Sequence, residues 1–76
     1  MQLTTQGLVL REVNYKESDK ILTILTETEG KITAKARGVA RTRSKLAAAT
    51  QLLCFSELTL FGHKGYWTIN EAVTVE

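Results

Sequence analysis

The segment KITAKARG, residues 31–38, constrains the fold most, because its side chains alternate strictly between two kinds. Ile32, Ala34 and Ala36 are apolar, and the residues between them are polar or basic. A period of two places the apolar side chains on one face of a β-strand, which is typical of a half-buried sheet. Most of the chain repeats this pattern between turn signals spaced roughly ten residues apart, so it predicts an all-β domain of short strands.

The predicted elements are five strands and one short helix. SKLAAATQLL, residues 44–53, has three consecutive alanines and no turn residue, which favours the helix, and Ser44 is a suitable N-cap. Polar segments at 14–19 and 27–31 and the glycine-bracketed GHKG at 62–65 are expected to be loops. Gly30 is expected to take a positive φ angle. The strands are expected at 6–13, 20–26, 31–38, 54–61 and 66–75.

The alternation also predicts which side chains face the core. In the second strand, Leu22, Ile24 and Thr26 are expected on one face, opposite Ile21, Thr23 and Leu25. In the last strand, Trp67 is expected in the core with Ile69, Val73 and Val75, which leaves Tyr66 outside. Phe55 and Phe61 are expected to share a face with Glu57 and Thr59.

Three strands, a short helix and two further strands form the element order of an OB-fold, a five-stranded Greek-key barrel with the helix between strands 3 and 4. Closure also removes exposed sheet edges. An SH3-like barrel is the alternative, but such barrels usually lack a helix at this point. With 76 residues, the chain is expected to form one domain with a modest core.

Composition argues against several classes of protein. The single cysteine, Cys54, cannot form an internal disulfide or supply a zinc site of several thiolates, and it is expected to be a small core residue. His63 is expected in an exposed loop, and no phosphate-loop or metal-ligand spacing is present. We therefore expect no enzyme, cofactor, metal or small-molecule substrate. The sequence has no apolar run long enough for a membrane span and no charged leader typical of export. A cytoplasmic location is therefore expected.

Charge is concentrated in one place. Residues 31–45 hold six basic residues and no acid, while the whole chain has a net charge of only +2. Outside that segment, four basic residues oppose eight acidic ones, a balance of −4. A mildly acidic body with one basic segment indicates a localised anionic partner.

The basic segment has two parts. Alternate residues of a strand stand about 6.6 to 6.8 Å apart, so cations on strand 3 could follow the phosphates of a nucleic-acid strand. The remaining cations lie near the predicted helix start, where they oppose the helix dipole unless an anion binds there. Solvated charges without a ligand are the alternative. Tyr66 is the best exposed of the aromatic candidates for stacking, which are Tyr15, Phe55, Phe61, Tyr66 and Trp67. The candidate site residues are Lys31, Lys35, Arg37, Arg41, Arg43, Lys45 and Tyr66.

The chain resembles the N-terminal domain of the bacterial recombination mediator RecO. The resemblance rests on GLVL followed by a tyrosine, ESD at 17–19, T-x-x-x-G at 26–30, ARG at 36–38 with the basic run ending at Ser44, and AAATQLLCFSELTLF. It covers about residues 5 to 75, and the order and spacing of the motifs are more specific than any one of them. Ala40 departs from the pattern, since many members have a basic residue there.

The resemblance implies an OB-fold that binds single- and double-stranded DNA and supports strand annealing in recombinational repair. It further implies action with RecR and single-stranded DNA-binding protein in loading RecA, and a continuation into an α-helical domain. The family's DNA-binding role would carry over to the basic residues at 35, 37, 41, 43 and 45. Two other functions remain open: a protein-interaction module for an acidic partner, with Phe55 and Phe61 as a docking patch, and an RNA-binding barrel of the translation machinery.

Overall fold

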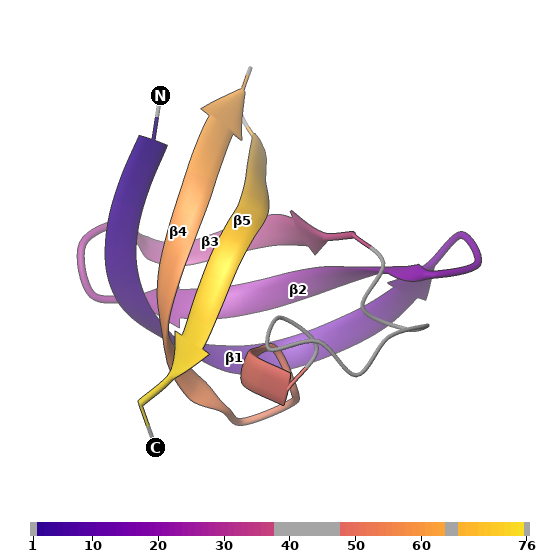
Figure 1. Ribbon diagram of the computed structural model, residues 1–76, viewed down its shortest axis with the longest axis horizontal. Helices are drawn as coiled ribbons and strands as arrows, with labels where there is room; N and C mark the ends of the chain where they lie inside the picture. Colours follow the sequence, from indigo (N-terminus) through magenta and orange to yellow (C-terminus); the bar gives the residue numbers. More distant parts are fainter. Residues whose placement is uncertain (1, 38–47, 64–65, 76) are drawn as a thin grey trace.

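Five strands close into a barrel in the computed structural model (Figure 1), which describes residues 2–37, 48–63 and 66–75. Around the barrel the strands follow the order β1-β2-β3-β5-β4, so β4 returns to pair with β1. The predicted all-β OB-fold barrel is confirmed. The strands are β1 (Gln2–Tyr15), β2 (Asp19–Thr26), β3 (Gly30–Ala36), β4 (Phe55–His63) and β5 (Tyr66–Thr74).

The long first strand joins both halves of the barrel. Its beginning pairs with β4 and its end with β2, and the two partners overlap at Gly7 and Leu8. A β-bulge between Val9 and Arg11 lets the strand bend there. Gly7 allows a close approach at this bend, because a Cβ would lie only 2.7 Å from Cγ2 of Ile24. β1 is longer than the predicted 6–13, since residues 2–5 also pair with β4.

Four of the five strand pairs are antiparallel, and β3 pairs with β5 in parallel. Alanines occupy several inward positions, so the enclosed core is small. Ile32 and Trp67 pack against it from its edges. The buried core residues are Val9, Leu22, Ile24, Ala34, Ala36, Ala49, Leu58, Leu60, Ile69 and Ala72.

The predicted faces hold for β2, β3 and β4 but fail in the second half of β5. Leu22, Ile24 and Thr26 are buried, as expected. Val73 and Val75, however, are 52% and 48% exposed. The β4–β5 register shifts so that Thr59 pairs with Glu71 and Leu60 with Ile69, which leaves Asn70 as an extra residue. This bulge reverses the inward and outward positions, so Ala72 enters the core in place of the two valines.

The connection between β3 and β4 packs against β1. Ala48 and Ala49 have helical backbone, and the chain turns from Thr50 onward, so the predicted helix ends before 53. Its predicted start at 44–47 lies outside the described residues. The Leu53 N–H donates to the Val9 carbonyl at 2.7 Å, and the Val9 N–H donates to the Cys54 carbonyl at 3.1 Å. The buried Ser56 hydroxyl donates to the Ala49 carbonyl at 2.6 Å, which fixes the helical residues to β4.

Two local predictions have different outcomes. Gly30 has a φ of 69°, which confirms the predicted glycine turn between β2 and β3. The Thr26 hydroxyl closes this turn: it donates to the Gly30 carbonyl at 2.7 Å and accepts the Glu29 N–H at 3.0 Å. Cys54, in contrast, is wrongly predicted as a core residue. It precedes β4 and is only partly buried, with its Sγ 3.5 Å from the Ser56 Oγ.

Candidate nucleic-acid interface

The outer face of β3 carries two cations, Lys31 and Lys35, with Thr33 between them, and Arg37 directly follows the strand. Ala34 and Ala36 point inward and are buried, and this phase turns the basic side chains outward. Neighbouring outward residues stand about 6.6 to 6.8 Å apart along a strand, so the charges form a line. Lys31 and Arg37 are exposed and Lys35 is partly exposed. We call Lys31, Lys35 and Arg37 the β3 cation row.

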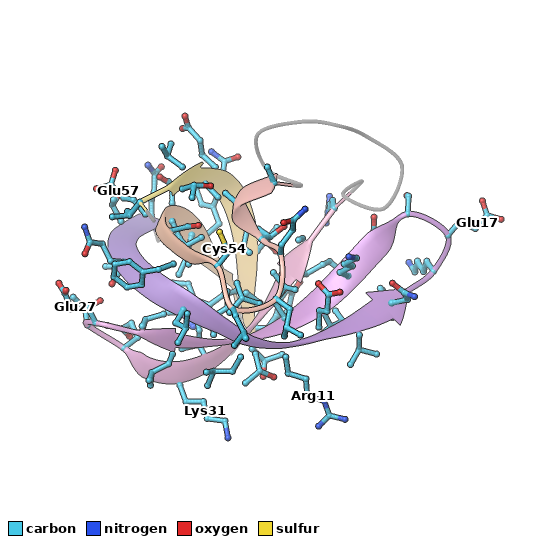
Figure 2. The ribbon with its side chains drawn as sticks, turned by 90° about the horizontal axis from the view of Figure 1, so that it is seen from below. Arg11, Glu17, Glu27, Lys31, Cys54 and Glu57 are labelled. Carbon is cyan, nitrogen blue, oxygen red and sulfur yellow. The ribbon has the colours of Figure 1, made fainter. Side chains whose placement is uncertain are left out.

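The end of the row at Lys31 has a further cation nearby on the same side of the molecule. Lys31 pairs with the exposed Leu25, and Arg11 pairs with Thr23 two residues further along β2. Figure 2 shows the Lys31 and Arg11 side chains projecting from the same side of the barrel into solvent. Sequence reasoning did not connect Arg11 with the row, because the two cations lie on strands that are brought together through β2.

At its other end, the row meets an aromatic side chain. The Lys35 Nζ lies 5.0 Å from the centroid of the Tyr15 ring, and the Lys16 Nζ lies 5.3 Å from the same centroid. Both distances are within the range of a cation–π interaction. Tyr15 is 39% exposed, so part of the ring remains open to solvent.

Strand register explains this meeting of residues far apart in the chain. Tyr15 is the last residue of β1 and pairs with Asp19, while Ile21 pairs with Val13 on one side and Lys35 on the other. The β1–β2 hairpin extends beyond the rest of the barrel (Figure 1), and Glu17 lies at its tip (Figure 2). Lys16 turns there with a φ of 58°. Tyr15 was one of several aromatic candidates in the sequence, and Lys16 carried no signal of its own.

Two other aromatic predictions concern β4 and β5. Trp67 packs against the core, as predicted, with its ring over Gly62 of the neighbouring strand. Tyr66 is 51% exposed at the start of β5, which confirms its predicted exposure. Phe61 is 43% exposed and Phe55 is partly exposed, so both lie on the outer face of β4 as predicted. Phe61 and Tyr66 lie on neighbouring strands, since Phe61 pairs with Thr68, two residues after Tyr66, whereas Phe55 is at the other end of β4.

Three predicted site residues, Arg41, Arg43 and Lys45, lie outside the described residues, as do Lys64 and Gly65 of the predicted β4–β5 loop. β4 continues to His63, which pairs with Tyr66, so the strands extend further into that loop than predicted.

Charge on the opposite side of the β1–β2 hairpin is already balanced in part. Lys20 Nζ lies 3.4 Å from the Glu12 carboxylate, and both side chains are partly exposed. Lys20 pairs with Ala36, which points inward, so its side chain belongs to the face opposite the β3 cation row. Lys20 is therefore a cation of the same hairpin that lies outside the candidate interface.

Other kinds of site have little support in the described part of the chain. Residues 2–37, 48–63 and 66–75 contain no group of three or more His, Cys, Asp or Glu placed to hold a metal ion. Within the same ranges, no helix has the length and apolar character needed to cross a membrane. What the outer face offers chemically is therefore a set of cations and a partly open aromatic ring.

Comparison with known proteins identifies the family. The family model described as "Recombination protein O N terminal" matches residues 1–76. Curated proteins named DNA repair protein RecO are similar to this chain: that of Acetivibrio thermocellus is 47% identical over 97% of the chain, and that of Clostridium novyi 39% over 95%. The protein from Listeria monocytogenes is 42% identical over 93% of the chain. The chain spans about 30% of the length of these relatives. The match along its whole length shows that the chain belongs to the family of RecO N-terminal domains.

Proposed function

We propose that this chain binds DNA, both single- and double-stranded, through the β3 cation row and the basic connection that follows it. The observation that carries the proposal is the row itself: Lys31 and Lys35 lie on the outward face of β3, and the exposed Arg37 directly follows the strand. OB-folds commonly bind oligonucleotides on the face formed by strands 2 and 3, where this row lies. Phosphates, which repeat along every nucleic-acid strand, are the ligands that such a line of cations fits.

The family supports DNA as the anion. Relatives carry the name DNA repair protein RecO, and this chain corresponds to a part of them. By resemblance, we propose a role in recombinational repair that supports strand annealing and, with RecR and single-stranded DNA-binding protein, the loading of RecA. A role of this kind involves binding rather than catalysis, and it implies a cytoplasmic location in a bacterial cell.

Binding of this type is chiefly electrostatic and reads little sequence. If all six basic residues of 31–45 contact phosphates of a single strand, the slope of log affinity against log salt is about −4, at roughly −0.7 per contact. Fluorescence anisotropy with labelled oligonucleotides of unrelated sequences, measured over a range of salt, tests this. Similar affinities for all sequences with a steep slope support the proposal. A nearly flat salt dependence would contradict it.

Two competing functions are decided by the same assay. An RNA-binding barrel predicts that RNA oligomers displace labelled DNA much better than DNA oligomers of the same length. A protein-interaction module predicts no DNA binding but a response to acidic peptides, with the exposed Phe61 as a contact. Replacement of Phe61 by Leu would then weaken peptide binding, whereas the DNA proposal expects it to leave DNA affinity unchanged.

A further inference from the structure

We infer that Tyr15 is a stacking platform for one base of single-stranded DNA, an inference that rests on the proposed function and adds a residue that tells single strands from duplexes. Cations alone bind both DNA forms, because both carry phosphates. An aromatic ring can stack on a base only where that base is not already stacked within a duplex, which makes the ring selective for single strands.

The position of the ring supports this role. Tyr15 ends β1 on the same outer surface as Lys35, and the residue is 39% exposed. The ammonium groups of Lys16 and Lys35 lie 5.3 and 5.0 Å from its centroid, one contributed by the hairpin turn and the other by β3. A base placed on the ring would therefore have cations close by for its flanking phosphates.

The outer surface beside Tyr15 carries two apolar side chains and one acidic one, Asp19, which pairs with Tyr15. Val13, two residues before Tyr15, is 49% exposed and pairs with Ile21, which in turn pairs with Lys35. An apolar strip next to an aromatic ring suits the faces of bases, which are apolar, while their phosphates remain with the lysines. Arg37, two residues beyond Lys35, extends the row past this strip.

Phe61, the exposed aromatic residue of β4, lies further from the β3 cation row. Phe61 lies on β4 and pairs with Thr68, which separates it from Lys35 by the width of β5. Tyr15 has cation–π contacts with two lysines, and one of these, Lys35, belongs to the β3 cation row itself. This is why we assign the stacking role to Tyr15 rather than to a residue of β4.

Substitution of Tyr15 tests the inference. Tyr15→Leu is expected to weaken the binding of a short single-stranded oligonucleotide about 5- to 150-fold, the range given by loss of one stacked base. Duplex affinity is expected to change less than about twofold, because paired bases are not available to the ring. Tyr15→Phe keeps the ring and should bind both forms like the unaltered chain. Phe61→Leu, at a similarly exposed aromatic residue, is the matched control and should change neither affinity.

A second measurement does not depend on a variant that folds. A single-stranded oligonucleotide containing the fluorescent base 2-aminopurine should lose fluorescence at one position when the unaltered chain binds, and unchanged fluorescence at every position would contradict the inference. Equal weakening of single-stranded and duplex binding in a folded Tyr15→Leu chain would overturn the inference and leave the proposed function standing. Absence of binding of either DNA form to the unaltered chain would instead remove the proposed function, and the inference with it.

Discussion

Removal of two neighbouring charges from the β3 cation row should weaken DNA binding by an amount that depends on salt in a calculable way. Lys35 lies on the outward face of β3 and the exposed Arg37 directly follows the strand, two residues later, so each can contact a separate phosphate. The double replacement Lys35→Gln and Arg37→Gln removes both charges and keeps the side chains polar. Both positions are at least partly exposed, so the barrel core is unaffected.

The expected magnitude follows from counterion release. Each phosphate contact contributes roughly 0.7 to the salt slope on a single strand, so loss of two contacts makes the slope shallower by about 1.4. If the affinities of the two chains converge near 1 M salt, the loss is about 25-fold at ~0.1 M and only about 5-fold at ~0.3 M. An affinity ratio that falls as salt rises indicates an electrostatic contact, because loss of a salt-independent contact would give the same affinity ratio at every salt concentration.

Fluorescence anisotropy with one single-stranded oligonucleotide at several salt concentrations measures both quantities. Lys20→Gln is the matched control: it removes a charge from the same hairpin region, but that charge is paired with Glu12 at 3.4 Å on the opposite face. Its salt slope should equal that of the unaltered chain. A double variant with an unchanged slope, or a Lys20→Gln chain that loses as much as the row variants, would refute the assignment of the row to phosphate binding.

Three further predictions concern the stability of the barrel that positions the interface, and equilibrium denaturation measures the free energy of unfolding in each case. Gly7→Ala should lower the free energy of unfolding by about 1 to 3 kcal/mol through overpacking, because the new Cβ meets Ile24 Cγ2 at 2.7 Å; an unchanged stability would refute the close approach. Thr26→Val should cost about 1 to 3 kcal/mol, since the hydroxyl that closes the β2–β3 turn is lost, and a neutral effect would contradict that role. Ser56→Ala should cost about 1 to 3 kcal/mol because the Ala49 carbonyl loses its 2.6 Å donor, and Ser56→Cys, a weaker donor, should not restore the loss in full.

Periodicity predicted the barrel well because most inward positions follow a simple rule. In β3, small apolar residues alternate with cations without interruption, so the direction of the cation row could be read directly from KITAKARG. The predicted strands are all present, although β1 begins earlier and β4 extends to His63. The additional strand residues depend on pairing with a neighbouring strand, and the sequence pattern of one strand does not show that pairing.

A β-bulge accounts for the side chains of β5 whose positions were wrongly predicted. An extra residue at Asn70 has no distinctive sequence signal, yet it moves Val73 and Val75 from the core to the surface and brings Ala72 inward. The contact between Tyr15 and Lys35 was likewise hidden, because it depends on the registers of two successive strand pairs. Long-range register is a property of the closed sheet and cannot be obtained from alternation within one strand.

The most direct test of the account is an NMR titration of the chain with a short single-stranded DNA oligonucleotide. Backbone amide signals of residues 31–37 and of Tyr15 should shift progressively, while those of Leu58 and Leu60 in the core of β4 should remain in place. The shifts should reverse as salt is added, since the contacts are with phosphates. Shifts confined to β4 around Phe55 and Phe61, with β3 unchanged, would contradict the central claim that the β3 cation row is the DNA-binding surface.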